Sequence, residues 1–124
     1  MYGAAEIIQY LNVPAITGLL GTYATGKKNL LDTNVLPKTA TGNAINIYQS
    51  VPHSPDLVLI NTFTANCRSD SYANAQALAK AASDILHRLS KDGIGIYCKI
   101  LPVIPPADSR DDYNVPVEIR IKKR

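Results

Sequence analysis

The stretch that decides the fold runs from residue 63 to residue 86 and reads FTANCRSDSYANAQALAKAASDIL. Apolar and polar residues alternate from Phe63 to Cys67, which predicts a strand with one buried face. From residue 75 onward, small and apolar residues recur at helical spacing as far as Leu89. The Ser-Asp-Ser run at 69–71 offers N-caps between the two patterns. The stretch therefore predicts a strand that leads directly into a long amphipathic helix.

On the C-terminal side, Gly93 stands where a glycine commonly follows a helix end. Alternating apolar residues at 96–100 and at 117–121 predict two further strands. Between them, the proline- and aspartate-rich residues 102–114 predict a loop. We therefore expect a helix followed by two closing strands.

On the N-terminal side, an apolar stripe over residues 4–11 predicts a short helix, and residues 15–20 allow another turn. Residues 21–42 are polar and predict a long irregular loop, interrupted by one apolar patch at 30–36 that allows a short strand. Residues 43–51 alternate and predict a strand ahead of the one at 57–67.

These elements predict an α+β fold in a single domain over residues 1–124. The expected architecture is a mostly antiparallel sheet of four to five strands packed against two helices, in the order α-β-β-β-α-β-β. The composition agrees, because 46% of the residues are hydrophobic and 19% are charged, which is typical of a globular domain. A chain of 124 residues can bury a core without disulfide or metal staples.

The net charge of +3 excludes little, because four of the 13 cations lie within residues 120–124. We interpret this as a solvated C-terminal end, since a dedicated nucleic-acid binder would show a broader basic face. No apolar run is long enough for a membrane helix, and the early Glu6 argues against a secretory signal. Two cysteines, Cys67 and Cys98, are too few for a disulfide scaffold and fit synthesis in a reducing cytosol.

No motif predicts catalysis, a cofactor or a metal. Residues 21–28 read GTYATGKK and resemble a phosphate-binding loop, but Lys28 replaces the required hydroxyl and no helix pattern follows. The two histidines, His53 and His87, stand in unrelated settings. The acidic residues 108–112 lack the spacing of a calcium loop. Seven tyrosines favour contact surfaces, so the residues favour a binding or assembly module over an enzyme.

Two junctions carry a resemblance to a known family. The N-terminal helix ends in YLNVP at residues 10–14 and runs into LLGT at 19–22, and the strand-to-helix stretch quoted above follows. This layout resembles the tail-terminator proteins of long-tailed bacteriophages, also called tail-completion or minor capsid proteins. The resemblance covers residues 4–121 and rests on the layout and on the strand-to-helix junction. The segment before Asn43 is atypical for the family.

The resemblance implies a virion protein of the tail or neck, made in the host cytoplasm. Members assemble as a hexameric ring on the head-proximal end of the tail tube. The ring stops tube polymerisation and joins the tail to the head–tail connector, while DNA passes through it without sequence-specific binding. The resemblance implies no enzyme activity, no cofactor and no membrane. The expected partners are other copies of the chain, the major tail tube protein and connector proteins.

A ring needs two different patches on each copy, because a heterologous interface joins unlike surfaces. We expect residues 27–38 and 102–114 to become ordered when partners bind. The candidate assembly contacts in and around these segments are Tyr23, Lys27, Lys28, Lys38, Asp108, Arg110 and Tyr113. A head–tail connector or head-closure protein remains an alternative, as does a nucleic-acid-binding module that uses residues 120–124. An enzyme with an unrecognised pocket is the last alternative.

Overall fold

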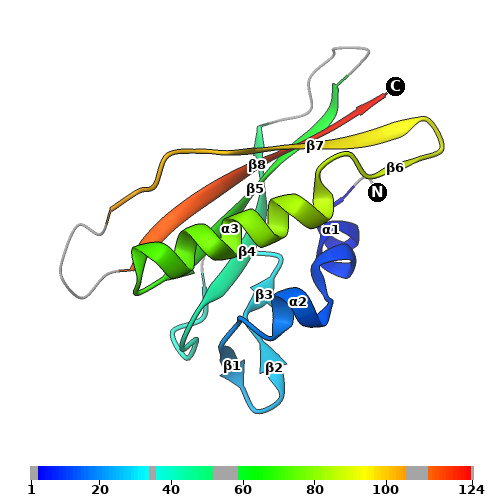
Figure 1. The fold of residues 1–124 in the computed structure, drawn as a ribbon. Coiled ribbons are helices and arrows are strands. Elements are labelled where there is room, and N and C mark those ends of the chain that lie inside the picture. Colours follow the sequence, from blue (N-terminus) through cyan, green and yellow to red (C-terminus); the bar gives the residue numbers. More distant parts are fainter. Residues whose placement is uncertain (1–2, 34–35, 52–58, 106–111, 124) are drawn as a thin grey trace.

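The computed structural model describes residues 3–33, 36–51, 59–105 and 112–123 (Figure 1). Along the chain, the elements are α1 (Ala4–Leu11), α2 (Pro14–Thr17), β1 (Thr22–Ala24), β2 (Lys27–Lys28), β3 (Leu30–Leu31), β4 (Ala44–Val51), β5 (Leu59–Ser69), α3 (Tyr72–Leu86), β6 (Ser90–Lys91), β7 (Ile94–Ile100) and β8 (Tyr113–Lys123). The predicted α+β class is confirmed, and so are the strands around residues 43–51 and 57–67 and the helix that follows them.

The main sheet has six strands within the described residues, in the order β3-β4-β5-β8-β7-β6. Its central pairs are antiparallel, with Phe63 on β5 opposite Gln49 on β4 and Ile119 on β8. β3 pairs with β4 in parallel, so the sheet is mixed. The expected four to five strands were too few, because a two-residue strand such as β6 leaves no alternating pattern in a sequence.

Three helices lie on one face of the sheet within the described part of the chain, where two were expected (Figure 1). α3 packs on β5, β8 and β7, while α1 and α2 contact α3. The extra helix, α2, begins at Pro14, whose fixed φ suits the first helical position. Fully buried side chains fill the space between the helices and the sheet, including those of Ile7, Leu11, Ile47, Leu78, Leu86, Ile96, Val117, Ile119 and Ile121.

The opposite side of the sheet, here called the polar face, carries the alternate residues of the same strands. Its described members are Asn46, Tyr48, Thr62, Thr64, Asn66, Arg68, Tyr97, Lys99, Glu118, Arg120 and Lys122. At the β4 end, the chain lies over this face, because Asn46 Nδ2 donates to Thr33 O at 3.1 Å and Asn46 is only 4% exposed. The alternation seen in the sequence therefore separates an apolar from a polar face.

The ends of α3 differ in how well the sequence predicts them. At the start, the Ser71 hydroxyl accepts a hydrogen bond from the Asn74 amide at 3.4 Å, as expected of an N-cap. At the end, the helix stops at Leu86, and Arg88 adopts a φ of 69°. Gly93 is not the helix-ending glycine: it follows Asp92 in the turn between β6 and β7, and both have positive φ. An Asp-Gly pair is typical of such a hairpin turn.

The three residues after α3 cover the outer side of β7. The Arg88 amide donates to Ile96 O at 2.7 Å, and the Ile96 amide donates to Leu89 O at 2.8 Å. Further along β7, the Cys98 amide donates to Nδ1 of His87 at 2.9 Å. The turn after the helix thus occupies part of a sheet edge.

Residues 21–33 are more regular than the long loop that was expected, and the short strand allowed within 30–36 is present as β3. β1 and β2 form an antiparallel hairpin, and β3 joins the main sheet. The buried Asn29 fixes the base of the hairpin, because its Nδ2 donates to Thr41 O at 2.8 Å and to Asn43 O at 3.2 Å. A Cβ at Gly21 would collide with the Thr41 carbonyl, so the close approach of these two segments requires glycine.

The expected loop at 102–114 is shorter than predicted at its C-terminal end, because β8 begins at Tyr113. Pro116 concealed this part of the strand, since proline is rare inside a central strand. Here it is tolerated at the point where β7 ends: the last register pair is Ile100 with Val117, and the Leu101 amide donates to Pro116 O at 2.9 Å. The residues from Leu101 to Pro105 are irregular apart from a bridge between Ile104 and Asn114.

Candidate interaction surfaces

Three of the predicted contact residues lie together on the β1–β2 hairpin, which projects from the body of the molecule (Figure 1). Tyr23 is half-buried, whereas Lys27 and Lys28 are exposed. Lys28 Nζ donates to Leu20 O at 3.4 Å, which ties one side of the hairpin to the end of the α2 region. Because residues 21–28 form a hairpin, they lack the strand–loop–helix arrangement of a phosphate-binding loop.

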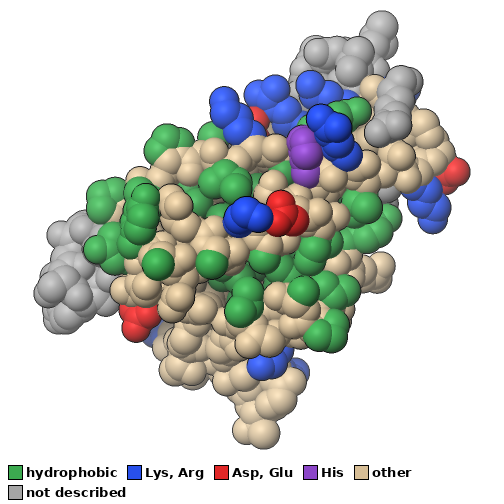
Figure 2. Space-filling model, viewed as in Figure 1, with side chains coloured by type: hydrophobic (Ala, Val, Ile, Leu, Met, Phe, Trp, Pro, Cys, Tyr) green, Lys and Arg blue, Asp and Glu red, His purple; other side chains and the backbone are tan. Residues whose placement is uncertain are grey.

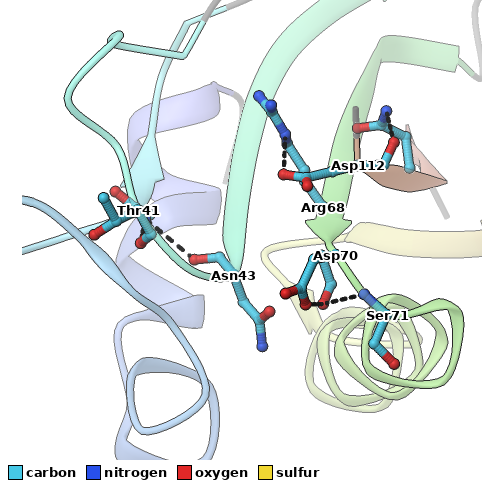
Figure 3. A network of polar contacts seen from close by, with 9 residues as sticks. Thr41, Asn43, Arg68, Asp70, Ser71 and Asp112 are labelled. Atoms are coloured by element: carbon cyan, nitrogen blue, oxygen red, sulfur yellow. Dashed lines mark hydrogen bonds and ion pairs between the residues drawn. The ribbon is translucent and has the colours of Figure 1, made fainter. Parts of the chain in front are cut away.

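Lys38 lies at a second place, in a hollow of about 290 Å³ that Arg68 and Asp112 also line. Arg68 Nε and Asp112 Oδ2 form an ion pair at 2.8 Å across this hollow (Figure 3). The next residue, Tyr113, is half-buried and packs edge-on against Tyr72, with 5.9 Å between ring centroids. The predicted contacts Asp108 and Arg110 lie outside the described residues.

An exposed apolar surface, here called the apolar end, lies where α3 and β8 begin and β7 ends. It comprises Tyr72, Ile100 and Ile104, whose exposed fractions are 48%, 42% and 54%. Ile104 bridges to Asn114, the neighbour of Tyr113, whose ring contacts Tyr72. Figure 2 shows hydrophobic side chains gathered over this end of the molecule. Clustered exposed apolar side chains mark surfaces that contact other proteins.

A fourth surface, here called the β7–β8 hollow, lies on the polar face. It has a volume of about 230 Å³ and is lined by residues 97–99 and by Glu118, Arg120 and Lys122. Arg120 Nε lies 2.7 Å from Glu118 Oε1, and Lys122 Nζ lies 5.9 Å from the centroid of the Tyr97 ring. The hollow therefore brings three cations together beside one carboxylate and one aromatic ring.

Sequence reasoning missed this hollow, although it noted the cations near the C-terminus. Lys99 and Glu118 face one another in the register, as do Tyr97 and Arg120, yet each pair is about twenty residues apart in the sequence. The signal for the hollow in the sequence is the set of polar positions on the two alternating strands. Only the pairing of β7 with β8 shows that Lys99 joins the C-terminal cations.

Both cysteine thiols lie in surroundings that disfavour the thiolate. Burial raises the pKa of the Cys67 thiol to about 12, and burial likewise raises that of Cys98 to about 12. Cys67 is fully buried, and Cys98 is partly exposed. Among the described residues, no three His, Cys, Asp or Glu side chains lie close enough to hold a metal ion. No helix in the described part of the chain is long and apolar enough to cross a membrane.

Comparison with known proteins identifies the fold. No protein-family model matches the chain, and no curated protein sequence matches it. Among solved structures, the chain is similar to a protein in the virion of a native gene transfer agent particle, with a TM-score of 0.61 and 18% sequence identity. The alignment covers 99% of this chain and 98% of that protein. The two chains therefore share one fold over nearly their whole lengths.

Proposed function

We propose that this chain is a structural virion protein that forms a ring on the head-proximal end of a phage tail tube. The ring stops tube polymerisation and joins the tail to the head. The observation that carries this proposal is the likeness over 99% of the chain to a protein in the virion of a gene transfer agent particle. The strand-to-helix junction at residues 63–86, which resembles tail terminators, independently favours the same role.

The surface chemistry fits a subunit that contacts unlike partners. A closed ring requires two different patches on each copy. The apolar end offers one patch, and the projecting hairpin with Lys27 and Lys28 offers a chemically different one. We propose that these two surfaces contact neighbouring copies, the tail tube protein and the connector. In this role the chain has no catalytic function and needs no cofactor.

The test is electron microscopy of lysates from the parent phage after deletion of this gene. Over-long tail tubes without heads are expected, because nothing then stops tube growth. Tails of normal length beside unattached heads would instead assign the chain to a connector or head-closure role. Normal infectious particles would contradict both.

A matched pair of variants then tests the apolar end. Ile104→Asp should fail to restore tails of normal length in the deletion strain, because it puts a charge on a contact surface. Leu19→Asp is the control, since Leu19 is similarly exposed, at 46%, but lies beyond α2. Circular dichroism of both purified variants checks folding. If Ile104→Asp restores tails as well as Leu19→Asp does, the apolar end is not an assembly surface.

A further inference from the structure

We propose that the β7–β8 hollow binds the phosphate backbone of double-stranded DNA, through Lys99, Arg120 and Lys122. Lys99 faces Glu118 in the register, and Arg120 and Lys122 follow Glu118 at alternate positions along β8, so the sheet fixes the spacing of the three cations. Residues two apart on one strand are separated by about 7 Å, and neighbouring strands by about 4.8 Å. The hollow therefore presents a row of positive charges to solvent along β8, with Lys99 at one end and Lys122 at the other.

Among the described residues, the net positive charge is concentrated at this margin. Residues 88–100 and 113–123 carry six cations, Arg88, Lys91, Lys99, Arg120, Lys122 and Lys123, against two carboxylates, Asp92 and Glu118. The rest of the described chain carries five cations and five carboxylates. Figure 2 shows Lys and Arg side chains along the margin where β7 and β8 run. A concentrated field of one sign attracts a polyanion and raises its rate of association.

Contacts within the hollow hold its groups in place. The Glu118 carboxylate holds the Arg120 guanidinium at 2.7 Å and offsets one positive charge. The Tyr97 ring lies between Lys122, 5.9 Å from its centroid, and the His87 ring, 6.2 Å between centroids. His87 is in turn fixed by the hydrogen bond from the Cys98 amide. This support reduces the ordering that the lysine and tyrosine side chains must undergo on binding.

The chemistry of the hollow favours DNA over an acidic protein segment. Protein interfaces have apolar cores and are depleted in lysine. Here the exposed large apolar residues Leu19, Tyr72, Ile100 and Ile104 belong to other surfaces. Interfaces with DNA are instead polar, strongly positive and built mainly on phosphate contacts. Contacts to phosphates are independent of base sequence, so we expect binding without sequence preference.

The experiment measures binding of the purified full chain to a short fluorescein-labelled DNA duplex by fluorescence anisotropy, over a series of salt concentrations. The wild type should bind at low salt and weaken as salt rises. The double variant Lys99→Gln, Lys122→Gln should bind more weakly on any sequence and lower the salt slope by about 2, one for each lost phosphate contact. Glu118→Gln should tighten binding, because it frees Arg120 from its ion pair and removes a negative charge that repels the phosphates.

The control is the double variant Lys27→Gln, Lys80→Gln, which removes the same charge far from the hollow. It should retain the wild-type affinity and salt slope. Equal losses in the two double variants, or no binding by the wild type at low salt, would overturn the proposal. So would polyglutamate displacing the duplex at a lower concentration than unlabelled DNA does, because that would identify an acidic protein segment as the ligand. If the double variant does not fold, the exposed single change Lys99→Gln gives the same comparison. The inference does not rest on the tail-tube role, and the purified protein tests it apart from any phage phenotype.

Discussion

The two sides of the polar face both carry polar side chains, but one side is covered by the chain and the other is open to solvent. At the β4 end, Asn46 is 4% exposed, because its amide donates to Thr33 in a segment of the chain that lies on the sheet. On the β7–β8 side, the Arg120 side chain is 51% exposed and lines the β7–β8 hollow. Polar alternation therefore identifies the face but not its use, which depends on whether the chain folds back over it.

The largest expected effect contrasts the two faces of β8. Ile119→Ala should lower the free energy of unfolding by about 2–5 kcal/mol, because it leaves a cavity in the fully buried core. Arg120→Ala, the change at the next residue on the polar face, should cost no more than about 1 kcal/mol, since the Arg120 side chain is 51% exposed and its ion pair with Glu118 is reached by solvent. Urea denaturation of both variants measures the difference. Similar losses would mean that the side chains of the polar face contribute as much to the free energy of unfolding as those of the apolar face.

The next effect tests how the segment over the β4 end is anchored. Gly21→Ala should cost about 1–3 kcal/mol, because its Cβ would force the hairpin base away from Thr41. Gly3→Ala is the control, since a Cβ there meets nothing within 4 Å. Thermal denaturation followed by circular dichroism gives both values. If Gly21→Ala leaves the thermal stability unchanged, the segment is not held tightly at this point.

A smaller effect compares the two ends of the polar face directly. Asn46→Ala should cost about 1–2 kcal/mol, because it removes the hydrogen bond that the buried Asn46 amide donates to Thr33 O. Lys99→Ala should change stability by no more than about 0.5 kcal/mol, as is usual for an exposed residue. Urea midpoints of the two variants measure this contrast. Equal effects would remove the distinction between a covered and an open end.

The smallest effect concerns the thiols. In the native protein at neutral pH, Cys98 should react slowly with a maleimide and Cys67 not at all, because both pKa values are raised and only Cys98 is partly exposed. In the unfolded chain, a thiol ionises near its ordinary pKa of 9, whereas folded Cys67 stays neutral up to about 12. The unfolded state therefore holds fewer protons in this range, and stability should fall as pH rises from 9 to 12.

Cys67→Ala provides the test of this linkage. The variant should lose part of the decline in the free energy of unfolding between pH 9 and pH 12, measured by urea denaturation at each pH. An unchanged decline would mean that other groups, and not the Cys67 thiol, cause it.

The sequence predicts the long elements that bury one face and expose the other. β5 and α3 were found because Phe63, Cys67, Leu78 and Leu86 repeat with the period of their own element. The fold over residues 21–42 was missed because it depends on side-chain to backbone contacts, above all those of Asn29 with Thr41 and Asn43. Such contacts leave no periodic pattern.

Two further errors have local causes. Leu89 keeps the helical spacing, so the sequence predicts a helix that continues past Leu86. It also places Gly93 at the end of that helix, although the Asp-Gly pair at 92–93 marks a hairpin. Pro116 concealed the first residues of β8. Among the candidate contacts, Tyr23, Lys27 and Lys28 lie together on the β1–β2 hairpin, whereas Lys38 and Tyr113 lie at another place. The β7–β8 hollow needed the strand register, which one sequence does not provide.

The turn after α3 also bears on how copies of this chain avoid aggregation. An uncovered strand at a sheet edge can recruit the same strand of another molecule, and repeated recruitment produces fibres. On β7, the backbone groups of Ile96 and the Cys98 amide are already bonded to Arg88, Leu89 and His87. Copies of the chain therefore cannot join along this part of β7 by extending the sheet, and any contact at this place must be made by side chains.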